Sequence, residues 1–189
     1  MTYLPLFQMP KPVKIIARSS SITNAFVNGI IPCIIPTEQE VKEVLEILGM
    51  KDTGIKCSYC GGECTEWDHF RPLIKNKRPT GYISEIHNLV PACGKCNQSK
   101  GNSEWKTWII GPATLSPKSR NIANLNTLIE RLEAYEAWSQ PRRIDFEHIV
   151  GEEKWHKHWE NCDKLHQQMR ETQILSDEIK EMLICSIKG

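Results

Sequence analysis

Apolar side chains follow a helical repeat just after Thr37. The positions, spaced three and four residues apart, are Val41, Val44, Leu45 and Leu48. Thr37 and Glu40 have the spacing of a capping box, in which each side chain bonds to the backbone amide of the other residue. Gly49 suits the left-handed residue that closes many helices. The pattern therefore predicts a helix that begins after Thr37 and ends before Gly49.

The C-terminal part of the chain carries two longer helical repeats. In the first repeat, apolar residues recur from Ile122 to Trp138, and Pro141 then interrupts them. The second repeat starts near residue 152, passes through Trp159 and continues towards Leu183. Aromatic side chains at this spacing usually face a protein core, so we expect both stretches to be packed helices.

Short apolar runs elsewhere indicate extended structure. Residues 13–16 and 30–35 are rich in isoleucine and valine, so we expect short strands or extended segments there. Residues 66–70 and 88–90 are predicted to form two further strands, and Pro91 is predicted to end the second one.

These patterns divide the chain into three parts. Residues 1–50 are expected to form a small N-terminal α/β segment, residues 51–110 a central module, and residues 111–189 a C-terminal helical region. Within the central module, helical spacing begins at Gly94, after the two predicted strands. We therefore expect an α+β fold in which accessory segments flank the central module.

Composition narrows the class of protein. The chain has 189 residues, enough for a sizeable core, and no apolar run approaches the length of a membrane-spanning helix. Prolines near the start disfavour a signal peptide. Eight cysteines then favour metal binding and buried thiols over disulfides, and we expect a cytoplasmic protein.

The net charge is only +1, but the central module holds an excess of positive charge. Residues 51–110 contain nine basic and six acidic side chains. Four of the basic residues fall in one stretch with prolines and a glycine, typical of a loop, which we call the basic loop: Arg71, Lys75, Lys77 and Arg78. Such a loop is either a solvated surface or, beside a hydrolytic site, a contact for phosphate.

Two Cys-x-x-Cys pairs, Cys57/Cys60 and Cys93/Cys96, are the strongest chemical signal. The two-residue spacer lets both sulfurs of a pair face one point, so the two pairs together can complete a tetrahedral zinc site. In a plain zinc ribbon the pairs lie about 15 to 20 residues apart. Here 32 residues separate Cys60 from Cys93, which predicts that a second structure is built between the pairs.

The remaining cysteines have other predicted roles. Cys64 could replace Cys60 as a zinc ligand, but the glycines after Cys60 suit the tight turn of a zinc knuckle. We therefore expect Cys64 to pack nearby as a small apolar side chain. Cys33, Cys162 and Cys185 have no partner at ligand spacing and are interpreted as core residues.

The strand predicted at residues 66–70 and the residue after the second cysteine pair carry side chains suited to phosphodiester hydrolysis. This reaction needs a base for the attacking water and positive charge for the anionic transition state. His69 can act as the base. Asp68 and Asn97 offer a carboxylate and an amide oxygen, which with waters form the hard oxygen site that Mg²⁺ or Mn²⁺ prefers. The sequence thus predicts two unlike metals, a structural zinc and an exchangeable catalytic ion.

The order of these residues resembles that of a known family. The motifs that carry the resemblance are Cys57-x-x-Cys60, Trp67-Asp68-His69, Ile86-His87-Asn88-Leu89-Val90-Pro91-Ala92-Cys93, and Cys93-Gly94-Lys95-Cys96-Asn97-Gln98-Ser99-Lys100. They are similar to the zinc-bearing form of the HNH, or ββα-metal, endonucleases. The resemblance covers residues 57 to about 105 and implies a β-hairpin followed by a helix, with the metal between them.

The resemblance also implies roles for single residues. Asp68 corresponds to the first metal ligand, His69 to the general base, and Asn97 to a metal ligand at the third signature position. Asn88 is similar to the asparagine that holds the hairpin and orients the histidine. Asparagine replaces histidine at the third position, so the chain resembles an Asp-His-Asn subset that favours Mg²⁺ over Zn²⁺ at the catalytic site.

The resemblance implies a metal-dependent endonuclease that acts on DNA, with double-stranded DNA as the expected partner. The basic loop, Lys95 and Lys100 are the expected nucleic-acid contacts. By analogy with stand-alone members of the family, a bacterial or phage restriction or defence enzyme is the leading biological role. One such site cuts one strand, so a double-strand cut would require a homodimer, for which the C-terminal helices offer apolar faces.

Two other classes of function stay open. One is a zinc-stabilised module that binds nucleic acid without cutting it, and the other is a nuclease toxin or an RNA-directed nuclease. No aromatic base-stacking motif is recognisable in the sequence, so the residues alone do not distinguish DNA from RNA.

Overall fold

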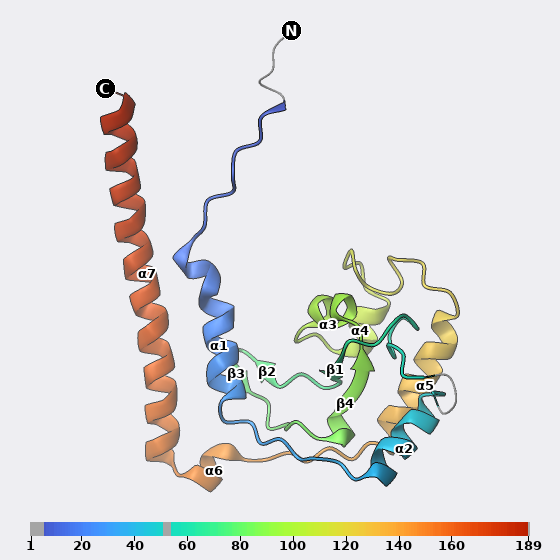
Figure 1. Ribbon diagram of the computed structural model, residues 1–189. Helices are drawn as coiled ribbons and strands as arrows, with labels where there is room; N and C mark the ends of the chain where they lie inside the picture. The colour runs from blue at the N-terminus through green and yellow to red at the C-terminus, as the bar shows by residue number, and fades with distance from the viewer. Residues whose placement is uncertain (1–5, 51–53, 189) are drawn as a thin grey trace. The chain divides into compact units, whose positions relative to one another are not determined.

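The computed structural model describes residues 6–50 and 54–188 (Figure 1). Contacts along the chain define two compact units. The larger unit is Val27–Ile149, and the smaller unit consists of the described parts of Met1–Phe26 and Val150–Gly189. Residues 51–53, where we predicted the boundary between the first two segments, lie outside the described residues. The three-part division of the chain stays a prediction.

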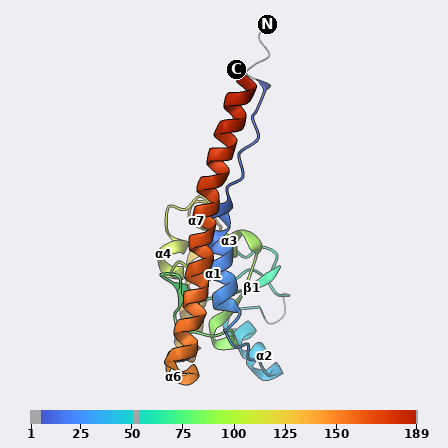
Figure 2. The same ribbon diagram turned by 90° about the vertical axis from the view of Figure 1, so that its left-hand side faces the viewer.

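The smaller unit is built on the long helix that the repeat from residue 152 predicted. Its elements are η2 (Ile15–Arg18), α1 (Ser19–Asn28) and α7 (Glu152–Lys188). Figures 1 and 2 show α1 beside α7. Thr23 Oγ1 lies 3.0 Å from His166 Nε2, and His158 Nε2 lies 3.0 Å from the carbonyl oxygen of Phe26. These polar contacts and the ring contact of Phe26 with His158, whose centroids are 5.0 Å apart, thus join α7 to α1.

Two predictions for the smaller unit are wrong in whole or in part. Residues 13–16 were expected to form a short strand or an extended segment; Lys14 is extended, but the 3-10 helix η2 begins at Ile15. The backbone amide of Ile15 donates to Gln173 Oε1 of α7 at 2.7 Å. In a strand, this amide would donate to the carbonyl of a neighbouring strand instead. Cys162 is buried as predicted, but Cys185 is exposed rather than part of a core.

In the larger unit, α2 (Glu38–Ile47) begins and ends as the sequence predicts. Thr37 Oγ1 accepts a hydrogen bond from the Glu40 amide at 3.3 Å, and Glu40 Oε2 accepts one from the Thr37 amide at 2.7 Å. Gly49 follows with a φ of 69°, in the left-handed region that glycine adopts without strain. Val44 and Leu48 are fully buried and anchor α2 in the core.

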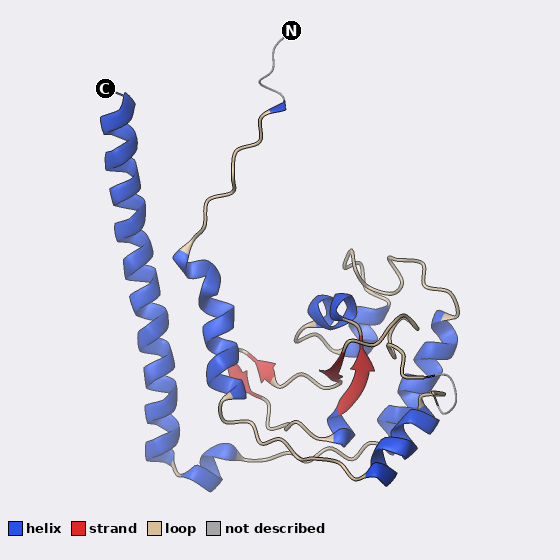
Figure 3. Cartoon of the chain, viewed as in Figure 1, coloured by secondary structure: helices blue, strands red, loops and turns tan. Residues whose placement is uncertain are grey.

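The centre of the larger unit is an antiparallel strand pair followed directly by a helix (Figure 3). The three elements are β1 (Glu66–His69), β4 (Leu89–Ala92) and α3 (Gly94–Lys100). Asp68 lies opposite Val90 in the strand pair. Pro91 does not end the second strand as predicted but lies inside it, opposite Trp67, because a two-stranded sheet leaves one edge of each strand unpaired.

Between β1 and β4 the basic loop folds into a second, smaller hairpin. Its strands are β2 (Ile74–Lys75) and β3 (Arg78–Pro79). The two turn residues, Asn76 and Lys77, have φ values of 51° and 62°. Both therefore lie in the left-handed region that a tight two-residue hairpin turn requires. Lys75 and Lys77 are exposed on this hairpin.

Residues 30–35 form an extended segment with one bridge rather than a strand. Cys33, which is exposed rather than part of a core, pairs in parallel with Ser84. The Ser84 amide donates to the carbonyl of Pro32 at 3.1 Å, and the Ile34 amide donates to the carbonyl of Ser84 at 2.8 Å. This segment therefore fixes the backbone position of Ser84.

An aromatic cluster forms the core beside the strand pair. The Phe70 ring lies 5.0 Å from that of Tyr135 and 5.2 Å from that of Trp105. The elements that complete the fold are η3 (Ile86–Asn88), α4 (Trp105–Ile109), α5 (Leu125–Trp138) and α6 (Phe146–Val150). Over the described parts of the chain, no helix has both the length and the apolar character needed to cross a membrane.

Candidate active site

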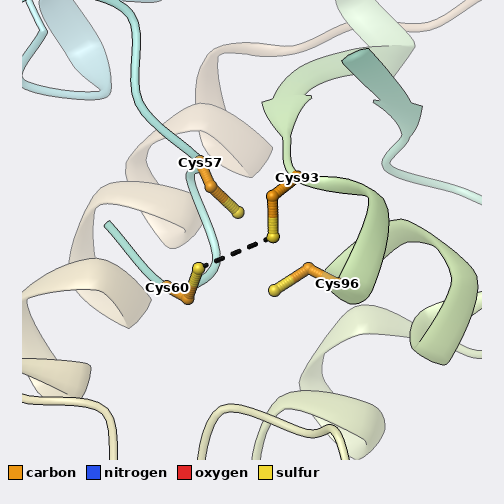
Figure 4. A group of neighbouring side chains, drawn as sticks. All are labelled: Cys57, Cys60, Cys93 and Cys96. Carbon is orange, nitrogen blue, oxygen red and sulfur yellow. Dashed lines mark hydrogen bonds between the residues drawn. The ribbon is translucent and has the colours of Figure 1, made fainter. Parts of the chain in front are cut away.

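Four cysteines converge at the start of α3 (Figure 4). The sulfurs of Cys57, Cys60, Cys93 and Cys96 all lie within 4.8 Å of one another. Cys60 Sγ is 3.8 Å from Cys93 Sγ. Two sulfurs at corners of a tetrahedron about 2.3 Å from a central zinc are about 3.8 Å apart. The group is therefore positioned to bind a metal ion, and its sulfur donors are consistent with zinc.

The electrostatics of the cysteine group also favour a cation. Hydrogen bonding to Cys60 raises the pKa of the Cys57 thiol, and hydrogen bonding to Cys57 raises the pKa of Cys96. Each neighbouring thiol is thus harder to ionise when another sulfur already carries charge. A divalent ion removes this conflict because it stabilises all four sulfurs as thiolates.

The segment before β1 has the tight turn of a zinc knuckle. The Cys57 amide donates to the carbonyl of Gly62 at 2.8 Å, and Gly61 has a φ of 71°. The Ser58 amide donates to the carbonyl of Pro91 at 2.8 Å, which ties the knuckle to β4. Cys64 points elsewhere and donates from Sγ to the Glu66 carbonyl at 3.3 Å. Cys60, and not Cys64, therefore faces the other three cysteines.

The predicted metal ligands lie on facing surfaces of β1 and α3. Glu66 and Asp68 are two residues apart in β1 and therefore lie on the same face of the strand. Asn97 and Lys100 are three residues apart and share one face of α3. Asn97 Nδ2 donates to Glu66 Oε2 at 2.9 Å, and Lys100 Nζ lies 2.9 Å from Asp68 Oδ2. Strand and helix thus meet through these two pairs.

Asp68 is a buried carboxylate with two donors on one oxygen. Its exposed fraction is 4%, and Oδ2 accepts hydrogen bonds from Tyr59 Oη at 2.6 Å and from Lys100 Nζ. Burial raises the pKa of Asp68, while the charge of Lys100 and the hydrogen bond from Tyr59 oppose that rise. The ion pair with Lys100 favours the charged form of Asp68 in spite of its burial.

His69 ends β1, and its side chain contacts another part of the domain. Its Nε2 lies 2.8 Å from Ser84 Oγ. Burial lowers the pKa of His69 to about 4, and the nearby charge of Lys100 contributes to the shift. The imidazole is therefore neutral at physiological pH, which is the form that accepts a proton.

Asn88 is fully buried and clamps the residues that follow His69. Its Oδ1 accepts a hydrogen bond from the Arg71 amide at 2.8 Å, and its Nδ2 donates to the Arg71 carbonyl at 3.1 Å. The Phe70 amide donates to the Asn88 carbonyl at 2.9 Å. These bonds fix the turn after β1, next to the predicted base.

The predicted nucleic-acid contacts do not all lie on one surface. Lys75, Lys77 and Lys95 are exposed. Arg71 is half-buried, and its Nη1 donates to Ser139 Oγ at 3.0 Å. Lys100 is 1% exposed and forms an ion pair with Asp68. Two of the six predicted basic contacts therefore turn inward and brace the domain.

Sequence reasoning missed Tyr59 and Ser84. The sequence contains one indication of Tyr59: it lies between Cys57 and Cys60, the two predicted zinc ligands of the knuckle. A residue in that position is brought close to the helix that carries the second cysteine pair. It contains no indication of Ser84, because 15 residues separate this serine from His69 and nothing local links the two.

Residues 57–103 match a protein-family model described as HNH endonuclease. These residues form an HNH endonuclease domain. The matched range contains both cysteine pairs and the predicted site residues Asp68, His69, Asn88 and Asn97. The HNH domain lies entirely within the larger unit, whose remaining residues supply α2 and α5 around it.

A similar protein is the CRISPR-associated endonuclease Cas9 of Corynebacterium diphtheriae. It is 31% identical over 86 residues, which cover 37% of this chain and 8% of the relative. The chain thus spans less than a tenth of the length of that protein. No solved structure matches the chain.

Proposed function

We propose that this protein is a metal-dependent endonuclease that hydrolyses phosphodiester bonds of DNA in its HNH domain. The observation that carries the proposal is the placement of Asp68 on β1 against the face of α3 that bears Asn97, with His69 next in the chain. We assign zinc to the four cysteines as a structural ion and Mg²⁺ or Mn²⁺ to Asp68 and Asn97 as the catalytic ion.

The hydrogen bonds of Asp68 and Asn97 fit this assignment. Both bonds to Asp68 use Oδ2, and neither uses Oδ1. Asn97 donates from Nδ2 to Glu66, so the amide presents its oxygen on the other side. One oxygen of each residue is therefore assigned to the metal. When bound, the ion supplies the positive charge that stabilises the transition state of phosphodiester hydrolysis.

His69 is proposed as the general base. We assign the proton on Nε2 to the hydrogen bond with Ser84, which leaves Nδ1 as the basic nitrogen. Nδ1 takes a proton from water, and the oxygen of that water attacks phosphorus. The bond to the 3′ oxygen breaks, and this oxygen takes a proton from a solvent water. The products carry a 5′ phosphate and a 3′ hydroxyl. Asn88 supports this step because it holds the turn after His69.

The exposed lysines of the domain are proposed to bind the phosphate backbone. Lys75 and Lys77 on the small hairpin, Arg78 beside them, and Lys95 on α3 form this set. Such contacts position nucleic acid without reading its sequence. We remove Lys100 and Arg71 from the predicted set because both are engaged inside the domain.

The biological role is proposed to be restriction or defence in a bacterium or phage, with the protein in the cytoplasm. This role rests on analogy with stand-alone HNH enzymes. A single site cuts one strand of a duplex, so cleavage of both strands is proposed to require a homodimer.

Plasmid cleavage tests the proposed function. Purified protein is incubated with supercoiled plasmid and Mn²⁺ or Mg²⁺, beside a chelator control, a His69→Ala variant and a His87→Ala variant. His87 is the matched control because it lies in the same domain but stacks on Trp138, with ring centroids 4.4 Å apart. Nicked or linear products should form with the wild type and His87→Ala and disappear with His69→Ala.

The opposite result points to the non-catalytic class. If the zinc-loaded, folded protein cuts neither plasmid nor an RNA control, the endonuclease proposal fails, and retained binding of either nucleic acid would identify a binding module. Cleavage of RNA alone would move the protein to the RNA-directed class.

A further inference from the structure

Asp68 receives its two hydrogen bonds from two different parts of the chain. Tyr59 Oη reaches Oδ2 from the zinc knuckle at 2.6 Å. Lys100 Nζ reaches the same oxygen from the end of α3 at 2.9 Å. The two donors are 41 positions apart in the sequence and meet at one carboxylate atom.

The same two parts of the chain supply the cysteines. Tyr59 lies between Cys57 and Cys60, and Lys100 ends the helix whose first turn follows Cys93 and includes Cys96. Each segment therefore gives two sulfurs to the metal group and one donor to Asp68. An ion bound by all four sulfurs would join the two segments and so set the distance between the two donors.

We propose that Tyr59 and Lys100 are positioning residues that carry the geometry of the zinc centre to Asp68, the ligand of the catalytic ion. The inference rests on the proposed function, since it concerns the same metal site. Neither residue touches the reacting atoms; each acts through Asp68.

The packing around Tyr59 makes this coupling stiff. Tyr59 is fully buried, and its ring meets that of Trp108 edge-on with centroids 5.2 Å apart. Trp108 Nε1 donates to Ser99 Oγ on α3 at 3.0 Å. The ring is thus held between the knuckle and the helix, so its hydroxyl moves only when one of them moves.

Lys100 extends the coupling to the backbone beside the base. Its Nζ also donates to the carbonyl oxygen of His69 at 2.8 Å. One ammonium group therefore bonds to the side chain of the metal ligand and to the main chain of the next residue. Displacement of α3 would disturb Asp68 and His69 together.

Loss of the Tyr59 hydroxyl should weaken binding of the catalytic ion more than it destabilises the fold. Partners that orient a metal ligand typically change metal affinity by about 10- to 100-fold when they are removed. The Tyr59→Phe variant loses only the hydroxyl and keeps the ring that packs on Trp108. We expect this variant to retain one zinc per chain and to bind Mn²⁺ about 10- to 100-fold more weakly than the wild type.

Tyr135→Phe is the matched control. Tyr135 is also fully buried, but its hydroxyl donates to the carbonyl of Ile86 at 2.8 Å and does not contact Asp68. It loses the same atom from the same core. We expect its Mn²⁺ affinity to equal that of the wild type, even if its stability falls.

The experiment measures Mn²⁺ binding and cleavage separately on the full chain. Free Mn²⁺ is counted by electron paramagnetic resonance during a titration of the zinc-loaded protein, and zinc is counted by elemental analysis. Cleavage rates are then measured over a series of Mn²⁺ concentrations. For Tyr59→Phe, the Mn²⁺ concentration at half-maximal rate should rise about 10- to 100-fold, while the rate at saturating Mn²⁺ stays within a few-fold of the wild type.

The outcomes separate the inference from the proposed function. If the wild type binds Mn²⁺ and cuts, and Tyr59→Phe behaves like the wild type, the inference alone is overturned. If Tyr135→Phe loses as much Mn²⁺ affinity as Tyr59→Phe, the effect is one of core packing and the inference is again overturned. If the wild type neither binds Mn²⁺ nor cuts, both fail. A Tyr59→Phe variant that loses its zinc as well would also contradict a purely positioning role.

Discussion

Nε2 of His69 lies 2.8 Å from Oγ of Ser84, and this contact connects the end of β1 to the segment before η3. It restricts the rotation of the imidazole, and with the proton that we assign to Nε2 it leaves Nδ1 as the basic nitrogen. Ser84→Ala removes that hydrogen bond, so the imidazole of His69 is still present but can rotate. A general base contributes about 10²- to 10⁴-fold to a rate, so loss of its orientation should reduce the rate of the cleavage step by roughly tenfold or more.

Single-turnover cleavage at saturating Mn²⁺ measures this effect. Ser119→Ala is the control, because the Ser119 hydroxyl bonds to the carbonyl of Gly111 instead. An unchanged rate in Ser84→Ala would show that the serine does not orient the base.

Lys100 and Asp68 form a buried ion pair whose disruption should destabilise the zinc-loaded protein in the absence of Mn²⁺. Removal of one partner from such a pair typically costs about 3 to 5 kcal/mol, because the other charge stays buried without compensation. Lys100→Met should therefore lower the free energy of unfolding by about this amount. Mn²⁺ should restore part of the loss, since a cation at Asp68 replaces the missing charge.

Urea unfolding with and without Mn²⁺ tests this prediction. Lys106→Met removes an ion pair with Glu136 of the same length, 2.9 Å, but Lys106 is 56% exposed. That control should change stability by less than about 1 kcal/mol. Equal effects of the two variants would mean that burial of the Lys100 pair does not matter.

Removal of the ion at the four cysteines should unfold the domain around β1, β4 and α3. The knuckle and α3 meet at the sulfurs, and free thiols cannot replace the metal bonds. We expect a thiol-directed reagent to release one zinc, to abolish cleavage and to broaden the amide resonances of these elements. Added Mg²⁺ should not reverse the loss, whereas reduction and added zinc should.

Cysteine variants sharpen this test. Cys60→Ser should lose zinc, while Cys64→Ser should keep it, because Cys64 bonds to the Glu66 carbonyl outside the group. Zinc retained by Cys60→Ser but lost by Cys64→Ser would reverse the ligand assignment.

Lys77 occupies a backbone conformation that glycine would adopt at lower cost. Its φ of 62° is left-handed, which costs a residue with a Cβ atom roughly 1 kcal/mol. Lys77→Gly should therefore raise stability by about this amount. The same change should weaken DNA binding and reduce the slope of log K against log salt by about 0.9, because one phosphate contact is lost.

Lys75→Ala separates charge from strain. Lys75 lies in β2 of the same hairpin and carries the same charge, but it has no left-handed φ. It should weaken DNA binding similarly without raising stability. If Lys77→Gly binds DNA as tightly as the wild type, the hairpin tip is not a phosphate contact.

Local patterns predicted the parts of the fold that local physics decides. The capping box at Thr37 and Glu40 formed as expected because its bonds join residues three apart. The cysteine pairs and the strands that they bracket were also predicted, since ligand spacing restricts geometry strongly. The strand or extended segment expected at residues 13–16 gives way to a 3-10 helix at Ile15, because β-branched content is a weak signal that packing against α7 overrides.

The site was predictable only as far as its motifs reach. Asp68, His69 and Asn97 stand in a recognisable order, but the contacts that hold them come from Tyr59, Ser84 and Lys100. Sequence position suggested that Lys100 would meet phosphate as an exposed charge. Its burial against Asp68 follows from the meeting of α3 and β1, which no single segment encodes.

The backbone hydrogen bonds between Ser84 and residues 32–34 decide which segment of the chain can be transferred to another protein as a working domain. A fragment trimmed to residues 57–103 keeps the cysteines and the proposed catalytic residues. It loses the bond from the Ser84 amide to the Pro32 carbonyl and the bond from the Ile34 amide to the Ser84 carbonyl. It also loses the bond from the Tyr135 hydroxyl to the Ile86 carbonyl and the bond from the Arg142 amide to Glu85. We expect the graftable module, for fusion to a targeting protein, to be residues 27–149.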